Sequence, residues 1–536
     1  MNLVLKRLTA AAAALLLCGA AACLPAAAEE ADNTFTDQVI TYEKISGGVR
    51  IVSADTAVTE VNVMKEIDGY PIIEIGEKAF SGCNALKKIS VGERVRKIGE
   101  NAFAGCMSLE SVTVSEGLET VSDGAFGYCI GLKEIRLPES LTTLGSYAFA
   151  YCVTLEEVKL PDGVKTIQPY TFYHNSSLKK VTLPEHLESI QPTSFVSCDS
   201  LEALHIPASL TSIGEMAVIS CTGLKTVTAD AANPAYKTVD DTVQLDQAGE
   251  KLILYAAGNP ADSYTVPDGI KALEPYCFAG AINLKTITLP ASAEEIGDGA
   301  FADCIGLESF EYPAGITKIG SSIFADCASL KSFTIPDGVT EIGDFAFFSC
   351  KSLTEITLPA SVVSVGKEAF CDCTAMNRIE IPETVQQIGD YAFGYKLSEN
   401  AEGQGEASLQ EGFVISGRPA TAAKRYASDN KIKFDQHGID KQMIMLAAVI
   451  AAGVLFLAAV ILLIVRKLRT PKPEKGEIGS QAEEPDPNYV SILGDEESGD
   501  PYERDYGFQI DDEDDAEDEE ASEEEPETDG PADSGD

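Results

Sequence analysis

A phenylalanine recurs every 23 residues along most of this 536-residue chain. The first run is Phe80, Phe103, Phe126, Phe149, Phe172 and Phe195, and the second run is Phe278, Phe301, Phe324, Phe347, Phe370 and Phe393. Val218 keeps the register at the one regular position where phenylalanine is missing. A fixed period of this length is typical of a solenoid, in which each repeat forms one coil. One coil cannot bury its own apolar face, so the period predicts a stack with a continuous core.

Each repeat divides into three short segments, as the copy that ends near Phe149 illustrates. Residues 132–137 alternate apolar and polar side chains, which predicts a short strand. Pro138 ends this strand, because proline has no N–H to give to a neighbouring strand. The apolar pair Leu141 and Leu144 begins the return leg, and the segment around Phe149 is predicted to be a single helical turn that carries the ring into the core.

The repeat resembles the BspA-type leucine-rich repeats of bacterial surface proteins. The matching residues form a Leu-x-x-Ile-x-Leu-Pro strand, a Val-x-x-Ile-Gly leg and an Ala-Phe-x-x-Cys-x-x-Leu segment, as in the copy that runs from Ile342 to Leu353. The resemblance extends over residues 58–395. It implies a leucine-rich repeat solenoid, which is a horseshoe-like, β-rich α/β fold with short helical turns and a parallel sheet on the concave side. It also implies surface adhesion or recognition, for which the family has diverse partners.

The two ends of the chain predict a single-pass membrane protein. Residues 1–28 combine an early basic pair, an apolar run and a small-residue site, which is typical of a cleaved signal peptide; a lipoprotein signal using Cys18 or Cys23 is the alternative. Residues 443–465 carry no charge and are long enough for a transmembrane helix. Five basic residues follow within 466–475, which favours a cytoplasmic C-terminus and an extracellular solenoid in the cell membrane.

The negative charge is concentrated after the apolar segment. Residues 29–442 have 58 acidic against 32 basic side chains, whereas residues 477–536 have 26 acidic side chains against Arg504 alone. The segment 466–536 therefore consists of a basic part next to the apolar segment and an acidic tail. The tail is predicted to be disordered, because it has few apolar residues whose burial could offset the entropy lost on ordering. It is either a solvated spacer or a docking tail for a cytoplasmic partner. No basic surface of the nucleic-acid type is present, which excludes nucleic-acid binding.

The cysteines follow the same period as the rings. Ten of them stand three residues after the ring position, at 83, 106, 129, 152, 198, 221, 304, 327, 350 and 373. Equivalent side chains in a parallel stack point the same way, which favours buried free thiols over disulfides and disfavours a tetrahedral zinc site. A few disulfides remain the alternative. Cys277 and Cys371 are off this register and have no predicted place.

A column of alternating charge is predicted to stabilise the stack. The residue after the strand-opening leucine is Lys87, Glu110, Lys133, Glu156, Lys179, Glu202 and Lys225, and then Lys285, Glu308 and Lys331. Opposite charges therefore meet from coil to coil. Each exposed pair is worth only about 0.2–1 kcal/mol, but the alternation also disfavours register slips.

Interruptions of the period set the predicted domain boundaries. These are an N-terminal cap over 29–57, repeats over 58–228, a hairpin-like excursion over 229–268, repeats over 269–395 and a C-terminal cap over 396–441. In the excursion, residues 242–245 and 252–255 are the two predicted hairpin strands. The nearby Asp240, Asp241 and Asp246 have no defined calcium-ligand spacing.

No catalytic motif is recognisable. The four histidines are His174, His186, His205 and His437, and none lies in a nucleophile or metal motif. We therefore predict a protein that is not an enzyme and has no cofactor.

The candidate binding site lies on the predicted strands. The fifth strand position reads Ser90, Thr113, Arg136, Lys159, Thr182, His205 and Thr228, and then Thr288, Glu311, Thr334, Thr357 and Glu380. Arg136 and Lys159, with Lys180 one column over, form a basic island on an acidic solenoid, and Thr182 and His205 continue it. One interpretation is random variation at a solvated column. The other is an anchor for an acidic ligand such as an anionic glycan or a protein carboxylate patch.

Two functions are compatible with these observations. The first is a non-catalytic surface protein that binds an extracellular protein or glycan through its solenoid. The second is a single-pass sensor that passes ligand occupancy to its acidic tail, although Gly453 alone is not a helix-pairing motif.

Overall fold

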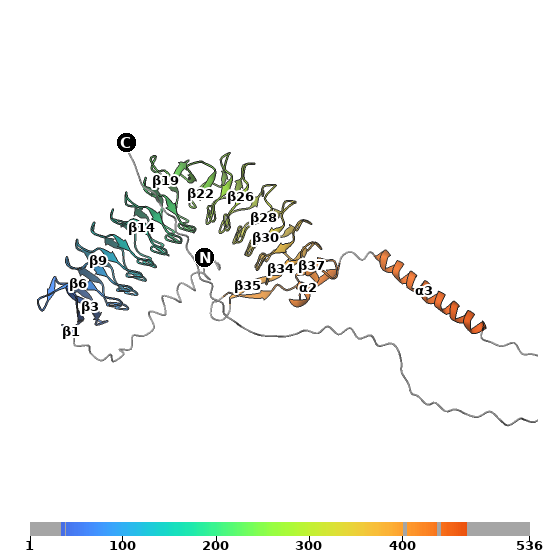
Figure 1. Ribbon diagram of the computed structural model, residues 1–536, viewed down its shortest axis with the longest axis horizontal. Coiled ribbons are helices and arrows are strands. Elements are labelled where there is room, and N and C mark those ends of the chain that lie inside the picture. Colours follow the sequence, from blue (N-terminus) through green and yellow to red (C-terminus); the bar gives the residue numbers. More distant parts are fainter. Residues whose placement is uncertain (1–33, 38, 400–404, 437–440, 469–536) are drawn as a thin grey trace, which may run out of the picture. The chain divides into compact units, whose positions relative to one another are not determined.

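The computed structural model describes residues 34–37, 39–399, 405–436 and 441–468. The predicted signal peptide over 1–28 and the predicted acidic, disordered tail over 477–536 lie outside the described residues. The repeats form stacked coils with two short strands in each coil (Figure 1).

The first strand of each coil is the predicted one. These strands are β4 (Glu60–Asn62), β7 (Lys88–Val91), β9 (Ser111–Val114), β11 (Glu134–Arg136), β13 (Glu157–Lys159), β15 (Lys180–Thr182), β17 (Ala203–Ile206) and β19 (Thr226–Ala229), followed by β23 (Ser263–Thr265), β25 (Thr286–Thr288), β27 (Ser309–Phe310), β29 (Ser332–Thr334), β31 (Glu355–Thr357) and β33 (Arg378–Glu380). Strands β4 to β19 form one parallel sheet. The register is one repeat, because Lys88 lies opposite Ser111, which lies opposite Glu134.

The return leg of each coil also forms a short strand, and these strands pair in parallel within several sheets, which is more regular than the sequence predicts. Its strands are β6 (Tyr70–Ile75), β8 (Lys97–Ile98), β10 (Thr120–Val121), β12 (Thr143–Leu144), β14 (Thr166–Ile167), β16 (Ser189–Ile190) and β18 (Ser212–Ile213), followed by β24 (Ala272–Leu273), β26 (Glu295–Ile296), β28 (Lys318–Ile319), β30 (Glu341–Ile342), β32 (Ser364–Val365) and β34 (Gln387–Ile388). Most of them bury an apolar residue such as Ile98 or Val121. The core therefore lies between two sheets and the ring segment.

The phenylalanine rings stack through the core. Phe103 and Phe126 are fully buried, with ring centroids 5.1 Å apart and planes within 3°. Every pair of rings one repeat apart within the two runs has centroids 5.0–5.8 Å apart. These distances are within the range of favourable aromatic pairs. The 23-residue period is therefore the period of a continuous aromatic column.

The segment around each ring is a run of tight turns and not a regular helical turn. The residues two before and two after the ring have positive φ, as at Lys78 (56°), Gly82 (72°), Asn101 (53°) and Gly105 (73°). A right-handed helix has negative φ throughout, so it cannot contain these residues. The predicted helical turn is therefore replaced by alternating left-handed residues.

These turns bond each coil to the next one. The N–H of Phe80 donates to the carbonyl oxygen of Ala102 at 2.7 Å. The N–H groups two residues before and two residues after the ring donate in the same direction, from Lys78 to Glu100 and from Gly82 to Ala104, both at 2.9 Å. We call this row of three bonds per coil the turn ladder. It continues the hydrogen bonding of the two sheets around the third side of the coil.

The cysteines bond to the turn ladder from inside the core. All twelve cysteines in the described residues are free and buried, as the spacing predicts for the ten that follow the period. The thiol of Cys106 donates to the carbonyl oxygen of Phe80 in the preceding coil at 3.0 Å. Cys129, Cys152, Cys198, Cys221, Cys304, Cys327, Cys350 and Cys373 make the same bond at 3.0–3.3 Å.

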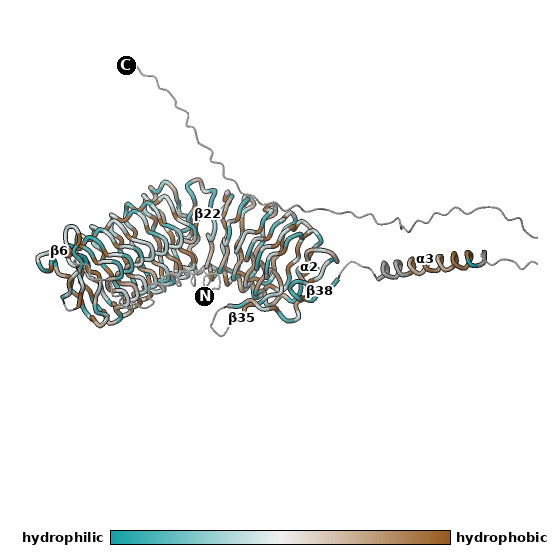
Figure 2. The backbone as a smooth tube through the Cα atoms, turned by 60° about the horizontal axis from the view of Figure 1, so that its bottom comes forward, coloured by the Kyte–Doolittle hydropathy of each residue, from teal (hydrophilic) through white to brown (hydrophobic). Residues whose placement is uncertain are grey.

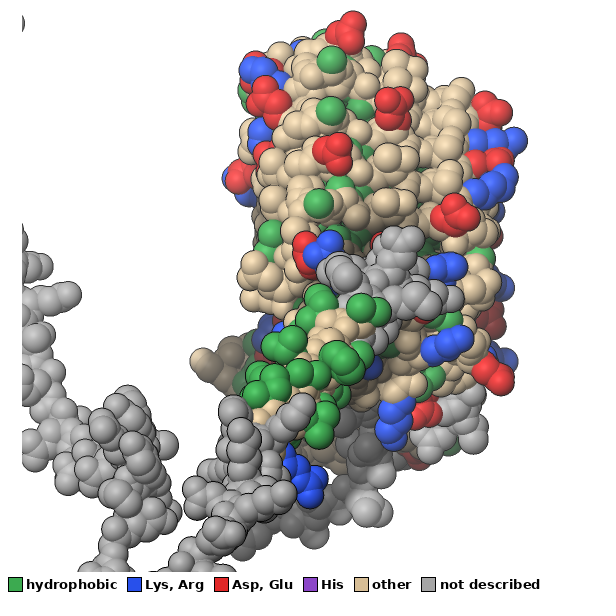
Figure 3. Space-filling view, turned by 90° about the vertical axis from the view of Figure 1, so that its right-hand side faces the viewer, with side chains coloured by type: hydrophobic (Ala, Val, Ile, Leu, Met, Phe, Trp, Pro, Cys, Tyr) green, Lys and Arg blue, Asp and Glu red, His purple; other side chains and the backbone are tan. Residues whose placement is uncertain are grey.

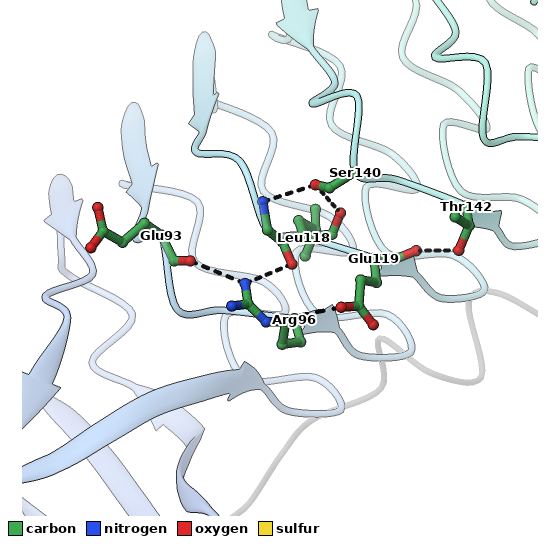
Figure 4. Close-up of polar contacts among 7 residues, drawn as sticks. Glu93, Arg96, Leu118, Glu119, Ser140 and Thr142 are labelled. Carbon is green, nitrogen blue, oxygen red and sulfur yellow. Dashed lines mark hydrogen bonds and ion pairs between the residues drawn. The ribbon is translucent and has the colours of Figure 1, made fainter.

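Serine and arginine side chains add polar bonds between coils (Figure 4). The Ser140 hydroxyl donates to the Leu118 carbonyl oxygen at 2.8 Å and accepts from the Gly117 N–H at 2.8 Å. Arg96 donates to the carbonyl oxygens of Glu93 and Gly117 at 3.1 and 2.8 Å. The turn after the first strand is therefore also tied to the next coil.

The predicted charge column forms cross-coil ion pairs. Ion pairs join Lys179 to Glu156 at 2.8 Å, Lys225 to Glu202 at 3.7 Å and Lys331 to Glu308 at 2.6 Å. Their side chains are largely exposed, so each pair contributes little to the free energy of unfolding.

The interval over 229–268 contains three antiparallel strands, β20 (Tyr236–Val239), β21 (Val243–Asp246) and β22 (Lys251–Tyr255). β21 and β22 are the two hairpin strands that the sequence suggests, and β20 is an additional one. Asp246 accepts from the N–H groups of Glu250 and Lys251 at 2.8 and 3.0 Å, so its carboxylate stabilises the turn of this hairpin.

Tyr255 occupies a ring position that the phenylalanine period misses. It lies one repeat before Phe278, is 1% exposed and stacks on that ring with centroids 4.9 Å apart. Its N–H donates to the carbonyl oxygen of Cys277 at 2.8 Å, as in the turn ladder. The period therefore resumes at Tyr255. Cys277 and Cys371 fill buried positions directly before and after a ring.

Separate elements cover the two ends of the stack. At the N-terminal end these are β1 (Thr34–Thr36), β2 (Ile40–Ile45), β3 (Gly48–Ala54) and β5 (Glu66–Ile67). At the C-terminal end these are β35 (Tyr395–Glu399), β36 (Gly405–Leu409), β37 (Val414–Gly417), α2 (Ala422–Asp429) and β38 (Lys433–Gln436). The Tyr426 hydroxyl of α2 accepts from the Phe393 N–H at 3.0 Å, which satisfies the last ring N–H of the turn ladder.

The remaining helix, α3 (Lys441–Leu468), is strongly apolar (Figure 2). Its stretch Val449–Arg466 has a mean hydropathy of 2.8. By length and composition it can cross a membrane, and within the described residues it is the one helix that can.

We expect Phe324→Ala to lower the free energy of unfolding by about 3–5 kcal/mol, because the ring is fully buried and contacts the rings on both sides. Since each coil contacts only its neighbours, protection from hydrogen exchange should fall most between residues 301 and 347. Chemical denaturation and hydrogen exchange measure the two effects. Thr334→Ala, on the exposed face of β29, is the control. Unchanged unfolding of Phe324→Ala contradicts the ring column.

Candidate functional site

The predicted binding residues lie on adjacent strands of the first sheet. In β11, β13 and β15 the central residue is buried and the two flanking residues are exposed. Lys159 lies opposite Thr182, and His205 lies opposite Thr228, in the column that contains Arg136. Lys180 lies in the neighbouring column, opposite Glu157 and Ala203. The structure therefore brings the five predicted residues together on one exposed surface, which we call the strand column.

Acidic side chains reduce the positive charge of the strand column. The Lys159 ammonium lies 3.0 Å from a carboxylate oxygen of Glu139, and this hydrogen bond raises the lysine pKa. Glu134 lies opposite Glu157 in the column of Lys180. Within the described residues, Arg136 makes no ion pair, and the same holds for Lys180. These two side chains are therefore the more available anchors for an acidic ligand.

Charges of both signs occur on the faces of the solenoid. Figure 3 shows Lys and Arg side chains interspersed with Asp and Glu side chains on one face. The ion pairs of the second sheet, such as Lys165 with Glu188 at 2.7 Å and Lys318 with Glu341 at 3.0 Å, follow the same pattern. A local basic group can therefore act only over a short range, because nearby acids and salt screen it.

A groove of about 450 Å³ runs across several turns and was not predicted from the sequence. Asp199, Asp303 and Asp326 line it, together with Ser220 and Ser349. Asp303 and Asp326 both stand two residues after a ring, and this shared position is the sequence signal that could have indicated the groove. Within the described residues, no group of three or more His, Cys, Asp or Glu side chains is arranged to hold a metal ion. We call this surface the aspartate groove.

Burial gives the aspartate groove an unusual acid. Loss of hydration raises the pKa of Asp303 to about 7, and the nearby Asp326 carboxylate contributes in the same direction. Farther along the same column, Asp372 accepts from the Ser349 hydroxyl at 2.9 Å and lies 3.4 Å from the Lys351 ammonium. The groove therefore changes its charge near neutral pH through Asp303.

The described histidines do not form a catalytic group. His174 stacks on Tyr151 with ring centroids 5.1 Å apart and packs edge-on against Tyr173. Burial lowers the pKa of His174, which favours a neutral packed ring. His205 lies 2.9 Å from the Thr228 hydroxyl oxygen on the strand column. His437 lies outside the described residues.

A second unpredicted cavity lies where the first run of rings ends. A cleft of about 240 Å³ is lined by residues 213–219, 253–255 and 274–276, among others. The sequence signals for it are Val218 at a ring position and the extra residues before Tyr255.

Comparison with known proteins identifies the repeat. The family described as the BspA type leucine rich repeat region matches six copies, over residues 58–178, 142–235 and 271–400. No curated protein is significantly similar in sequence. The predicted fold class, a leucine-rich repeat solenoid followed by one apolar helix, is confirmed.

Two solved structures are similar to the solenoid. A leucine rich cell surface protein from Faecalibacterium prausnitzii is 30% identical with a TM-score of 0.58, covering 68% of this chain and 96% of that one. The pneumococcal vaccine antigen PcpA is 20% identical with a TM-score of 0.50, covering 76% of this chain and 99% of that one. The second likeness concerns the fold alone.

We expect Asp303→Asn to flatten the dependence of stability on pH. The folded-state pKa is raised above the unfolded value, so the wild-type protein loses stability as pH rises from about 4 to about 7. Asparagine removes this titration and tolerates the left-handed backbone at this position (φ 62°). Thermal unfolding between pH 4 and pH 8 measures the effect, with the exposed Asp337→Asn as the control. Parallel profiles for Asp303→Asn and wild type contradict the raised pKa.

Proposed function

Because the chain belongs to the BspA type leucine-rich repeat family, we propose that it is a non-catalytic cell-surface protein that binds an extracellular protein or glycan through the strand column. In this proposal α3 anchors the chain in the cell membrane, with the solenoid outside and the C-terminus in the cytoplasm. The observation that supports this proposal most is that buried and exposed positions of the first sheet differ in how much they vary. The buried central residues Ile135, Val158 and Val181 are uniformly apolar, whereas the exposed residues beside them vary from coil to coil.

The exposed variation supports recognition, because these side chains do little to hold the fold. The strand column places Arg136 and Lys159 on neighbouring strands, and Lys180 follows on the next strand in the adjacent column. A guanidinium can bind a carboxylate or sulfate through two parallel hydrogen bonds, and the ammonium groups add charge. The proposed ligand is therefore acidic, either an anionic glycan or a carboxylate patch on a protein.

We expect the double variant Arg136→Glu and Lys159→Glu to weaken binding of an acidic ligand without changing the melting temperature, because both side chains are exposed. Binding of the full chain to immobilised dextran sulfate, compared with neutral dextran at several salt concentrations, provides the measurement. The matched control is the double variant Lys285→Glu and Arg378→Glu, which changes the net charge by the same amount. Lys285 is exposed directly before β25, and Arg378 is exposed in β33. Equal binding by the two double variants places recognition outside the strand column.

We expect protease added to intact cells to degrade the solenoid and to spare an epitope fused after Asp536. The physical reason is the cluster of five basic residues that follows residue 465, which resists translocation. Immunoblotting with one antibody to the solenoid and one to the epitope distinguishes the two sides. Loss of the epitope before lysis rejects the proposed orientation.

A further inference from the structure

The turn ladder is interrupted at one place between the two runs of rings. The N–H groups of Thr193 and Phe195 donate to the next coil, to the carbonyl oxygens of Glu215 and Ala217 at 3.2 and 2.7 Å. In that next coil, Val218 occupies the ring position and Met216 stands two residues before it. Their N–H groups are the corresponding donors. In the described part of the chain neither has a hydrogen-bond acceptor. Most other coils use these two donors in register, so both are left open here.

The cause is the shape of the following coil. Strand β22 extends to Tyr255, so this coil has a strand where other coils have the turn before the ring. The space left behind is the cleft of about 240 Å³, with Ile253, Leu254 and Tyr255 on one side and residues 214–219 on another. Residues 274–276 of the subsequent coil also line it. At the far end Gly280 closes the gap, because a Cβ on it would lie only 3.1 Å from the Ser220 Cα.

Elsewhere the chain closes comparable ends with a tyrosine hydroxyl. Tyr426 does so for the Phe393 N–H at the end of the solenoid. Beside the cleft, the Tyr236 hydroxyl accepts from the Ile213 N–H at 3.0 Å and donates to the Thr211 carbonyl oxygen at 3.3 Å, which closes the edge of β18. A backbone N–H without an acceptor in the protein can donate to a ligand, so the open donors of Met216 and Val218 favour a ligand that supplies acceptors.

The charges around the cleft select the ligand further. Glu215 is exposed on the wall of the cleft and makes no ion pair within the described residues. The one lysine that lines the cleft, Lys251, is paired with Glu274 at 2.9 Å. An adjoining groove that also includes Glu215 is lined by Glu294, Glu295 and Asp298, with Lys318 paired to Glu341 outside it. The surroundings of the open donors are therefore negative and favour a cation.

We propose that this cleft, between the Val218 coil and the coil of Phe278, binds an extended peptide segment of a partner protein that carries a lysine or arginine. Carbonyl oxygens of the peptide accept from the N–H groups of Met216 and Val218. The two donors belong to residues two positions apart. In an extended peptide, every second residue points its carbonyl oxygen to the same side, so the two spacings match. The basic side chain pairs with Glu215. This site is separate from the strand column, so either one can fail while the other stands.

Hydrogen exchange of the full chain in detergent micelles, resolved to single amides, tests the proposal. The probes are acetyl-Ala-Lys-Ala-amide, acetyl-Ala-Glu-Ala-amide and lysinamide, each at millimolar concentration. Without a probe, we expect the amides of Met216 and Val218 to exchange faster than those of Thr193 and Phe195, because only the second pair has acceptors. The lysine peptide should slow exchange at Met216 and Val218 several-fold and leave Thr193 and Phe195 unchanged.

Two variants separate the role of charge from the role of the fold. Glu215→Lys should abolish protection by the lysine peptide and permit protection by the glutamate peptide. Glu100→Lys is the matched control, since Glu100 holds the same coil position in an uninterrupted part of the stack, and it should change neither result. If Glu215→Lys unfolds at a lower temperature than wild type, Glu215→Gln replaces it, with loss of protection as the expected result.

Three results overturn the proposal. The first is slow exchange of Met216 and Val218 in the free protein, which means that these donors already have acceptors. The second is the absence of protection by the lysine peptide. The third is equal protection by lysinamide, which identifies a site for small cations in place of a peptide site.

Discussion

The fold depends on one geometric requirement. On each of the three sides of a coil, the backbone N–H groups must meet carbonyl oxygens of the neighbouring coil. Two sides consist of parallel strands, and the third is the turn ladder, where the N–H of the ring residue is the central donor. The phenyl rings stack because this bonding fixes the distance between coils, and the stacked rings in turn exclude water from the bonds. A change in the length of one coil breaks both effects together, which is why the insertion before Tyr255 leaves a cleft and open donors at the same place.

The left-handed turns show the energetic cost of this arrangement. Two residues in nearly every coil have positive φ, and many of them are not glycine, such as Tyr128 (60°), Tyr151 (59°) and Asp326 (61°). The left-handed conformation costs a residue with a Cβ about 1–2 kcal/mol. The turn ladder offsets this cost, because most of these residues, including Tyr128, Tyr151 and Asp326, give their N–H to the next coil.

Much of the fold follows from the sequence because one period fixes the ring, the thiol and the first strand at once. The left-handed turns could not be predicted from the sequence, since the residues at these positions share no side-chain type. Tyr255 is missed because the period is defined by phenylalanine, although a phenol ring fills the same space. In the candidate site, the alternation of apolar and polar residues predicts which side chains are exposed. It does not predict the Lys159–Glu139 contact, because such a contact depends on how far long side chains reach between coils.

The column of thiols leaves the described coils without covalent cross-links. The stack holds its coils together with hydrogen bonds and rings, and the twelve cysteines in the described residues are not cross-linked. Burial raises the pKa of Cys106 to about 12, so almost none of it is the reactive thiolate at neutral pH. The described fold therefore contains no cross-link that a reducing environment would break.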